Sequence, residues 1–413
     1  MQISKFKNLA KFRMDQETGG FQHPRYWEKA INLDAQDWDE VLKELLSSIV
    51  ESNTLPPMSI YVDKGIRPWL SQNIKEKPLT DESLDSWFKR WLNGEEYFIL
   101  MDKLTSWSYI LHNIVVDTFI APMLEDSDGL RMGASCYAVF GNYGFTPFGI
   151  HKDNEPIVLI NCGPGKKDVW FWEEKPDSSL IGSSELLKKS DDWEKGAIHY
   201  CIDVGDMVFI PRGVYHLLHT KDFSSMIGVA FFPGHVSYLL PSIIRSLRNE
   251  RDSDDPKVLW NGDYRPEQQV MKELKSFFST ESQDFDKAIQ REIRRLHAKL
   301  TSNAFLIEPP QPKRYTWNHC KDKYFRLPLH TQIVLVEEEE FLEMYIRGRV
   351  FNMKKNEEVI SMIKHINNGK AFCLQDIINT VNGNKTLAEE FLKMVFDFQG
   401  VVLDDSYVNE GRN

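Results

Sequence analysis

The amino-acid sequence predicts an α+β fold, in which an antiparallel jelly roll of the cupin kind (a double-stranded β-helix) lies between helical segments. Between residues 131 and 233, about eight short apolar runs are separated by glycine, proline and asparagine, with no long helical pattern among them. The residues on either side instead carry apolar side chains at helical spacing. With 413 residues, 42% of them hydrophobic, the chain has material for a large core and for about two to three domains.

The charge balance limits the class of partner. The sequence has 50 lysines and arginines against 61 aspartates and glutamates, a net charge of −11. This balance argues against a nucleic-acid partner, because such partners are held largely by the release of counterions from phosphates to basic side chains. An acidic surface instead favours a basic peptide or protein.

Cysteine usage and hydropathy indicate the compartment. The five cysteines are scattered without CxxC spacing, and an odd number indicates a reducing environment. No run approaches the roughly 18 apolar residues of a membrane span. The basic N-terminus also lacks the continuous apolar core of a signal peptide. We therefore expect a cytoplasmic protein with no membrane partner.

Residues 1–130 are expected to form a mainly helical N-terminal region that packs on the barrel. Apolar residues within Trp38–Ser52 recur near helical spacing, and Ser59–Val62 is a candidate short strand. A second predicted helix ends near Gly94 and carries one apolar stripe, made of Leu84, Trp87, Phe88 and Trp91. At this spacing the tryptophans are interpreted as core residues rather than as a ligand cage.

Residues 131–235 are expected to form the jelly-roll core. Its candidate strands are Ala134–Phe140, Phe148–Asp153, Ile157–Asn161, Asp168–Trp172, His199–Ile202, Met207–Ile210, His216–His219 and Ser225–Phe232. A barrel of this size has an interior wide enough for one metal ion and one small ligand. Trp170 and Trp172 share a strand face and are interpreted as core, and His199 and His219 as structural residues.

Two further domains are expected after the core. Residues 236–330 are predicted to form a helical segment and a proline-rich linker, with helices over Val236–Asn249, Glu267–Phe278 and Asp284–Thr301. Its mixed charges favour a solvated helix face or a dimer contact over a nucleic-acid patch. Residues 331–413 are predicted to form a winged-helix-like domain with strands at Gln332–Val336 and Phe341–Val350. A capping box, Thr386-x-x-Glu389, is expected to begin its last helix. Because the strands are acidic, a docking or structural role is favoured over DNA binding.

The residues with the clearest chemistry lie in the predicted core. His151 and Asp153 are two positions apart, so on an extended segment their side chains leave the same face. His216 follows a turn at Gly205, an apolar strand and a Pro-x-Gly sequence that aims it toward a barrel mouth. Two imidazoles and one carboxylate form the facial triad of non-haem Fe(II) oxygenases, which leaves metal positions open for substrates.

The pattern His151-x-Asp153, then Lys166, then Gly-Asp-x-x-x-Ile-Pro-x-Gly-x-x-His216 resembles the JmjC branch of the Fe(II)/2-oxoglutarate-dependent oxygenases. The resemblance is specific over about residues 131–233. More loosely, the order of jelly roll, helical dimerisation segment and winged helix is similar to the layout of the ribosomal oxygenases. It implies a dioxygenase that uses Fe(II), 2-oxoglutarate and O2 to hydroxylate a side chain of a protein or peptide, and it implies a homodimer.

The resemblance also implies roles for particular residues. His151, Asp153 and His216 are expected to hold the metal, with no further catalytic residue. Lys166 is expected to bind the distal carboxylate of 2-oxoglutarate; Lys167 is the alternative, because the preceding Gly-Pro-Gly loop can shift the register by one residue. Tyr137 or Ser135 replaces the asparagine that the family often has in its last barrel strand.

Two other classes of function are compatible with these residues. A non-oxidative cupin, such as an isomerase or a small-molecule binding module, keeps the metal but not the cosubstrate, and commonly carries more histidine ligands. A non-catalytic interaction protein acts through the flanking domains instead. It predicts that replacing His151 or Asp153 leaves function intact.

Overall fold

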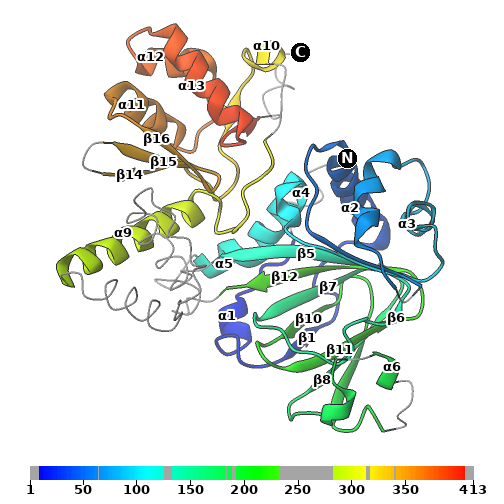
Figure 1. Cartoon of the computed structure of the whole chain (residues 1–413). Helices are drawn as coiled ribbons and strands as arrows, with labels where there is room; N and C mark the ends of the chain where they lie inside the picture. Colours follow the sequence, from blue (N-terminus) through cyan, green and yellow to red (C-terminus); the bar gives the residue numbers. More distant parts are fainter. Residues whose placement is uncertain are drawn as a thin grey trace, which may run out of the picture.

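The computed structural model describes residues 9–63, 65–124, 133–182, 184–187, 192–232, 282–312, 317–338 and 341–404 (Figure 1). Its largest element is an eight-stranded antiparallel sheet. In spatial order the strands are β1 (Arg25–Trp27), β10 (Met207–Ile210), β7 (Ile157–Pro164), β12 (Ser224–Phe231), β5 (Ala134–Gly141), β4 (Tyr97–Met101), β2 (Met58–Val62) and β3 (Gly65–Ile66).

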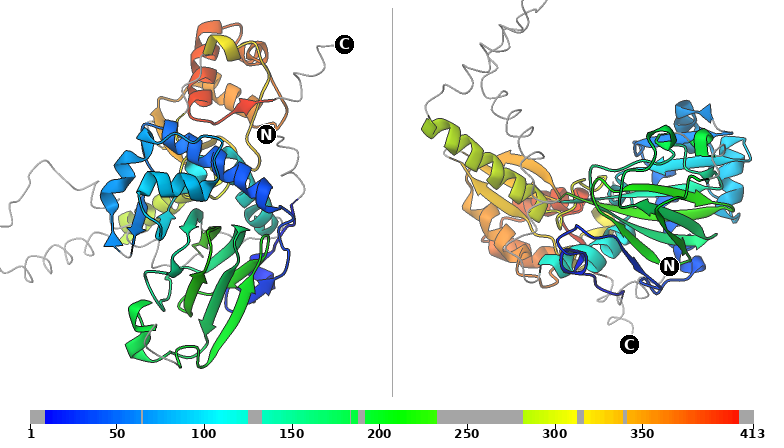
Figure 2. Two further views of the ribbon diagram at one scale, coloured as in Figure 1. Left: turned by 90° about the vertical axis from the view of Figure 1, so that its right-hand side faces the viewer. Right: turned by 90° about the horizontal axis from the view of Figure 1, so that it is seen from below.

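A smaller antiparallel sheet lies against it (Figures 1 and 2). Its order is β6 (Gly144–Phe145), β11 (Tyr215–Thr220), β8 (Lys167–Trp172) and β9 (Ala197–Ile202). Buried residues of the two sheets form one hydrophobic cluster, in which Val139 and Leu159 of the large sheet accompany Val169 and Leu218 of the small one. The two sheets therefore pack face to face, as the inner faces of a sandwich or closed barrel do.

All but one of the strands predicted between residues 131 and 233 overlap an observed strand. The exception is Phe148–Asp153, which is not a strand. Gly149 has a φ of +60° and its N–H donates to the Thr146 carbonyl, so the chain turns there. After this turn the segment forms two isolated β-bridges, one between Ile150 and Ile181 and one between His151 and His216.

The N-terminal region supplies helices and also four of the eight strands of the large sheet, β1, β2, β3 and β4. The helices are α1 (Met14–Glu17), α2 (Ala35–Glu51), η2 (Pro68–Glu76), α3 (Leu84–Leu92), η3 (Leu104–Ser106), α4 (Tyr109–Val115), the π-helix η4 (Val116–Ile120) and α5 (Ala121–Leu124). The Asp34 side chain caps α2, and the tryptophans of α3 are buried in the core, as predicted. Strand β4 was not predicted, because its sequence YFILM is apolar throughout and shows no alternation.

Short elements cover the outer face of the small sheet, and a separate unit follows. The cover includes η5 (Ser178–Leu180) and α6 (Ser184–Leu187). The later elements are α9 (Ser282–Thr301), α10 (Trp317–Cys320), β13 (Phe325–Arg326), β14 (Val334–Glu337), β15 (Leu342–Ile346), β16 (Arg349–Met353), α11 (Glu357–Ile366), α12 (Leu374–Thr380), α13 (Lys385–Asp397) and β17 (Val402–Leu403). The predicted helices Val236–Asn249 and Glu267–Phe278 lie outside the described residues.

Two expectations for the C-terminal unit need correction. The predicted strand Phe341–Val350 is a hairpin, because Arg347 and Gly348 adopt φ of 49° and 75° and reverse the chain. Helix α13 begins at a cap formed by Asn384, whose side chain accepts from the Leu387 N–H, rather than at Thr386. The unit thus has three strands where two were expected, followed by three helices and the strand β17.

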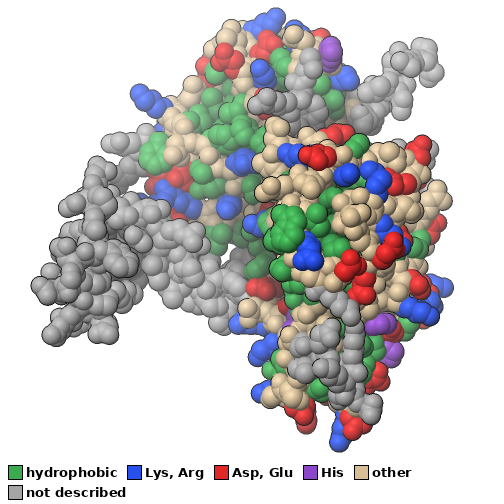
Figure 3. Space-filling view, turned by 45° about the vertical axis from the view of Figure 1, so that its right-hand side comes forward, with side chains coloured by type: hydrophobic (Ala, Val, Ile, Leu, Met, Phe, Trp, Pro, Cys, Tyr) green, Lys and Arg blue, Asp and Glu red, His purple; other side chains and the backbone are tan. Residues whose placement is uncertain are grey.

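The tip of that hairpin anchors the C-terminal unit to the rest of the molecule. Arg347 is 2% exposed, donates to Asn303 Oδ1 at 2.9 Å and lies 3.2 Å from His112 Nδ1 of α4. On the surface view, acidic and basic side chains are interspersed rather than sorted by sign (Figure 3). Within the described part of the chain, no helix is both long and apolar enough to cross a membrane.

Candidate metal centre and cavity

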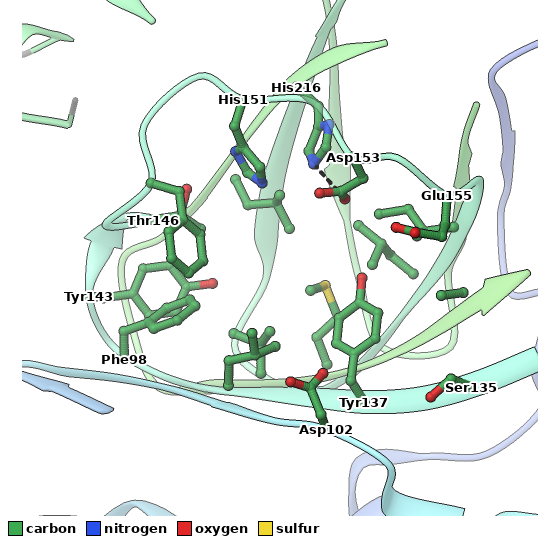
Figure 4. Close-up of a pocket in the computed structure, with 18 of the residues that line it drawn as sticks. Phe98, Asp102, Ser135, Tyr137, Tyr143, Thr146, His151, Asp153, Glu155 and His216 are labelled. Atoms are coloured by element: carbon green, nitrogen blue, oxygen red, sulfur yellow. Dashed lines mark ion pairs between the residues drawn. The ribbon is translucent and has the colours of Figure 1, made fainter. Parts of the chain in front are cut away.

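The structure brings His151, Asp153 and His216 together at one end of the space between the two sheets (Figure 4). His151 and His216 exchange two backbone hydrogen bonds, of 3.0 and 2.8 Å, and their ring centroids are 4.3 Å apart. Asp153 Oδ2 lies 3.5 Å from His216 Nε2. One ligand atom from each of the three side chains lies within 4.8 Å of the others, and this is the one such group among the described residues.

Backbone carbonyl groups set the tautomer of both histidines. His151 Nδ1 lies 2.9 Å from the Gly149 carbonyl oxygen, and His216 Nδ1 lies 3.1 Å from that of Val214. Because a carbonyl oxygen only accepts, each Nδ1 carries the proton and donates it. Each Nε2 is therefore left with a lone pair, which is the arrangement that a ligating histidine requires.

The electrostatics of the group also suit a cation. Burial, reinforced by the nearby His151, lowers the pKa of His216 to about 3, so this imidazole is neutral. Burial raises the pKa of Asp153, an effect that His151 partly opposes. The neutral His216 leaves the negative charge of a partly buried carboxylate for a bound divalent ion to compensate.

The triad opens into a cavity of about 320 Å³ between the sheets. Most of its lining is apolar and comes from both sheets, including Phe98, Leu100, Val139, Phe148, Ile157, Leu159, Leu218 and Met226. The polar residues fall into two groups. Tyr143 and Thr146 lie on one side, and Tyr137, Ser135 and Glu155 on the opposite side (Figure 4). A cavity with few, separated polar groups is typical of a site for a small ligand.

Lys166, which the sequence analysis put forward as the cosubstrate-binding cation, lies outside this cavity. Its side chain is 64% exposed and pairs with Asp203 at 2.8 Å. The alternative, Lys167, points inward. It is the first residue of β8 and shares a face with Val169 and Phe171, and Phe171 lies directly opposite His216 of β11. Neighbouring residues of a strand point to opposite faces, which separates the two lysines.

Lys167 is fully buried and its ammonium reaches the cavity wall through Tyr143. Nζ lies 3.1 Å from the Tyr143 hydroxyl and 5.0 Å from the ring centroid. Burial lowers the pKa of Lys167 to about 7. None of the described carboxylates contributes to that pKa, so within this part of the chain the lysine lacks an anionic partner.

Tyr137, the other residue predicted to contact the cosubstrate, does line the cavity. It lies directly opposite Gly228 on β12, and a Cβ at Gly228 would come within 2.1 Å of the tyrosine ring. The glycine therefore makes room for the ring. Burial raises the pKa of Tyr137 well above its ordinary value, helped by the negative charge of Asp153. The Tyr137 hydroxyl is therefore neutral and can donate a hydrogen bond.

Sequence reasoning missed several polar residues of the cavity. Thr146 has a buried hydroxyl with no hydrogen-bond partner among the described residues. Asp102 and Glu155 also line the cavity, and burial raises the pKa of Asp102. The turn Gly141-Asn-Tyr-Gly144 preceding Thr146 was visible in the sequence as a break between strands. Nothing in the spacing showed that it would face His151.

The residues interpreted as structural lie on the outer face of the small sheet. Trp170 and Trp172 are 6% and 3% exposed in a cluster beneath α6, which confirms that they are core residues. His199 and His219 lie beside them, and both contact Asp168. Neither histidine lines the cavity.

Comparison with known proteins finds similar structures but no similar sequence. No protein-family model and no curated protein sequence matches the chain. An X-ray structure of ycfD from Escherichia coli matches with 15% identity over 96% of this chain and 98% of that chain, with a TM-score of 0.50. Two more structures of the E. coli ribosomal oxygenase YcfD match at 14% identity over 96% and 99%, also at 0.50, and one holds cobalt and 2-oxoglutarate. At such identity the match shows a shared fold, which agrees with the resemblance seen in the sequence.

Proposed function

We propose that this protein is an Fe(II)- and 2-oxoglutarate-dependent dioxygenase that hydroxylates a side chain of a protein or peptide. The observation that carries the proposal is the triad of His151, Asp153 and His216, whose ligand atoms lie within 4.8 Å of one another beside the cavity. The YcfD fold, and the cobalt and 2-oxoglutarate that one YcfD structure contains, support it.

The triad fits Fe(II) by its donor types. Two nitrogen atoms and one carboxylate occupy one face of an octahedral ion and leave the other face to ligands from solution. When bound, the metal supplies the activation of O2 that hydroxylation needs, coupled to oxidation of 2-oxoglutarate to succinate and CO2. The protein orients the ligands: backbone carbonyls fix both rings, and the Gly213 N–H donates to the Asp153 carbonyl at 3.0 Å.

The side chains on the Tyr143 side of the cavity suit the distal carboxylate of 2-oxoglutarate. Lys167 supplies a positive charge, and the hydroxyls of Tyr143 and Thr146 supply donors, the latter without another partner among the described residues. A carboxylate placed there restores the full charge of a lysine whose pKa burial has lowered to about 7. We assign the role expected of Lys166 to Lys167.

The opposite side of the cavity is then left for the substrate. A five-carbon diacid fills only part of about 320 Å³. The remaining wall contains Tyr137, Ser135 and Glu155, which offer hydrogen bonds to a polar side chain beside the metal. The name ribosomal oxygenase describes YcfD, and by analogy it favours a protein substrate here over a small molecule.

Turnover of 2-oxoglutarate to succinate, measured with and without Fe(II), tests this function. We expect slow uncoupled turnover by the wild type in the presence of Fe(II) and none by Asp153→Ala. A metal-loaded protein that binds no 2-oxoglutarate and forms no succinate contradicts the proposal. That result would instead favour a non-oxidative cupin.

A further inference from the structure

The outer face of the small sheet carries a second group of metal-ligating side chains. Strand β9 contributes His199 and Cys201, which are two positions apart and share a face. Asp168 of β8 lies directly opposite Cys201, and His219 of β11 lies directly opposite Asp168. Three neighbouring strands thus present nitrogen, sulfur, oxygen and nitrogen donors in one patch.

The contacts of these side chains converge on one carboxylate. His199 Nε2 lies 3.0 Å from Asp168 Oδ1, and His219 Nδ1 lies 3.3 Å from Asp168 Oδ2. The thiol of Cys201 also hydrogen-bonds this carboxylate. Among the described residues, only the inner triad has ligand atoms that all lie within 4.8 Å of one another, so the outer side chains must rotate toward one another to bind one ion.

The patch is both supported and accessible. The His199 ring stacks on Trp170 with centroids 4.6 Å apart, and Phe145 packs against His219 at 4.9 Å. Cys201 is exposed, and the side chains of His199 and His219 are 46% and 27% exposed. An ion can therefore enter from solvent onto groups whose backbones belong to a rigid sheet.

We propose that His199, Cys201, Asp168 and His219 form a second metal site, for Zn²⁺. Imidazole, thiolate and carboxylate are the ligand types that zinc prefers, and the two negative charges of Cys201 and Asp168 balance the ion. The two imidazoles contact different oxygens of Asp168, so side-chain rotation at this exposed patch brings them onto one ion. Binding releases the thiol proton and ties the edge strand β9 to β8 and β11.

This site is independent of the proposed oxygenase activity. His216 and Leu218 of β11 point into the cavity, whereas His219 points to the other face of the same strand. The thiol gives a spectroscopic signal that the inner triad, which has no sulfur, does not give. Co²⁺ is a suitable probe, because a tetrahedral thiolate site produces sulfur-to-cobalt charge-transfer absorption and intense visible bands.

The test is a titration of the metal-free full-length protein with Co²⁺, followed by Zn²⁺. We expect the wild type to bind two equivalents of cobalt, with a thiolate band that Zn²⁺ abolishes. The variant Cys201→Ser should lose the band and one equivalent, and His199→Gln should weaken the band. Cys373→Ser, which changes a half-buried cysteine in the C-terminal unit, should keep both equivalents. Asp153→Ala should keep the band and lose the other equivalent.

Two results overturn the proposal. One is the absence of a thiolate band from the wild type at excess cobalt, which leaves only a hydrogen-bonded cluster around Asp168. The other is a band that survives in a folded Cys201→Ser protein. Far-UV circular dichroism of each variant establishes that it is folded. If Cys201→Ser does not fold, His199→Gln serves as the test variant instead.

Discussion

The two faces of the small sheet each gather histidines around a carboxylate, yet they use the ring nitrogens differently. On the inner face, backbone carbonyls accept from the Nδ1 atoms of His151 and His216, which frees both Nε2 atoms. On the outer face, ring nitrogens of His199 and His219 contact the Asp168 carboxylate directly. A group of the right residue types becomes a preformed metal centre when the backbone fixes the rings.

Burial separates the two faces further. The His216 side chain is 1% exposed, whereas that of His199 is 46% exposed. The two carboxylates do not differ in this way, since the Asp153 and Asp168 side chains are 35% and 31% exposed. The outer group therefore differs in its solvent-exposed histidines, and a metal there depends on the added thiolate of Cys201.

The two adjacent lysines repeat this comparison. Lys166 and Lys167 are chemically identical, and only the direction of the side chain differs. Lys166 reaches solvent and Asp203, and Lys167 reaches Tyr143 at the cavity wall. The face of the sheet on which each lysine lies therefore decides whether it can bind the cosubstrate. Matched variants that replace one residue on each face are the sharpest way to test this.

The largest effect is expected at the inner carboxylate. Asp153→Ala should lower the rate of 2-oxoglutarate turnover at least about 100-fold. Replacing a residue that only supports a metal ligand typically costs about 10- to 100-fold, and this variant removes a proposed ligand itself. The matched control is Asp203→Ala, which removes the outward carboxylate that pairs with Lys166. Succinate formation should be unchanged in the control, and equal loss in both variants would show that the inner group has no special role.

The lysine pair should give the next largest difference. Lys167→Met removes a charge-assisted bond worth about 1.5–3 kcal/mol, so the dissociation constant of 2-oxoglutarate should rise about 10- to 150-fold. Lys166→Met should change it less than about twofold. Calorimetric titration of the Mn²⁺-loaded proteins measures both. Weaker binding by Lys166→Met than by Lys167→Met would return the role to the outward lysine.

The affinity for 2-oxoglutarate should depend on pH. Because the pKa of Lys167 in the unliganded protein is about 7, the ammonium is present below pH 7 and is lost as the pH rises through that value. The dissociation constant should therefore be flat below pH 7 and rise by up to about tenfold per pH unit above it. The same titration of Lys167→Met should show no such rise, and a wild-type constant that is flat to pH 9 would contradict the assignment.

The smallest effect is expected at Thr146. Thr146→Val removes one neutral hydroxyl and keeps the shape of the side chain, so 2-oxoglutarate should bind about two- to tenfold more weakly. Thr80→Val, at an exposed hydroxyl that bonds only Glu82 among the described residues, is the control. If Thr146→Val binds as tightly as the wild type, the distal carboxylate lies elsewhere in the cavity.

The proposed metal ligands could be predicted from the sequence because both their residue types and the turns beside them are local signals. His151-x-Asp153 and the Pro-x-Gly before His216 mark side chains of unusual type next to chain reversals. The sequence could not decide between Lys166 and Lys167. The face that each lysine occupies depends on where β8 begins, and its pairing with β11 and β9 sets that position. Tyr143 and Thr146 were missed because their position beside His151 is a tertiary contact.

The flanking regions divide in the same way. Helix α2 and the stripe of α3 were predicted because apolar side chains recur at helical spacing. Strand β4 was not, because a strand buried on both faces is apolar throughout and looks like any other hydrophobic run.

The most direct test of the inner site is an anaerobic titration of the Fe²⁺-loaded protein with 2-oxoglutarate, followed by visible absorption. Chelation of iron by the keto acid gives a metal-to-ligand charge-transfer band. We predict this band in the wild type with one equivalent each of iron and 2-oxoglutarate, its absence in Asp153→Ala, and saturation at higher concentration in Lys167→Met. A wild-type protein that binds iron but develops no band, or a band unchanged in Asp153→Ala, would contradict the account.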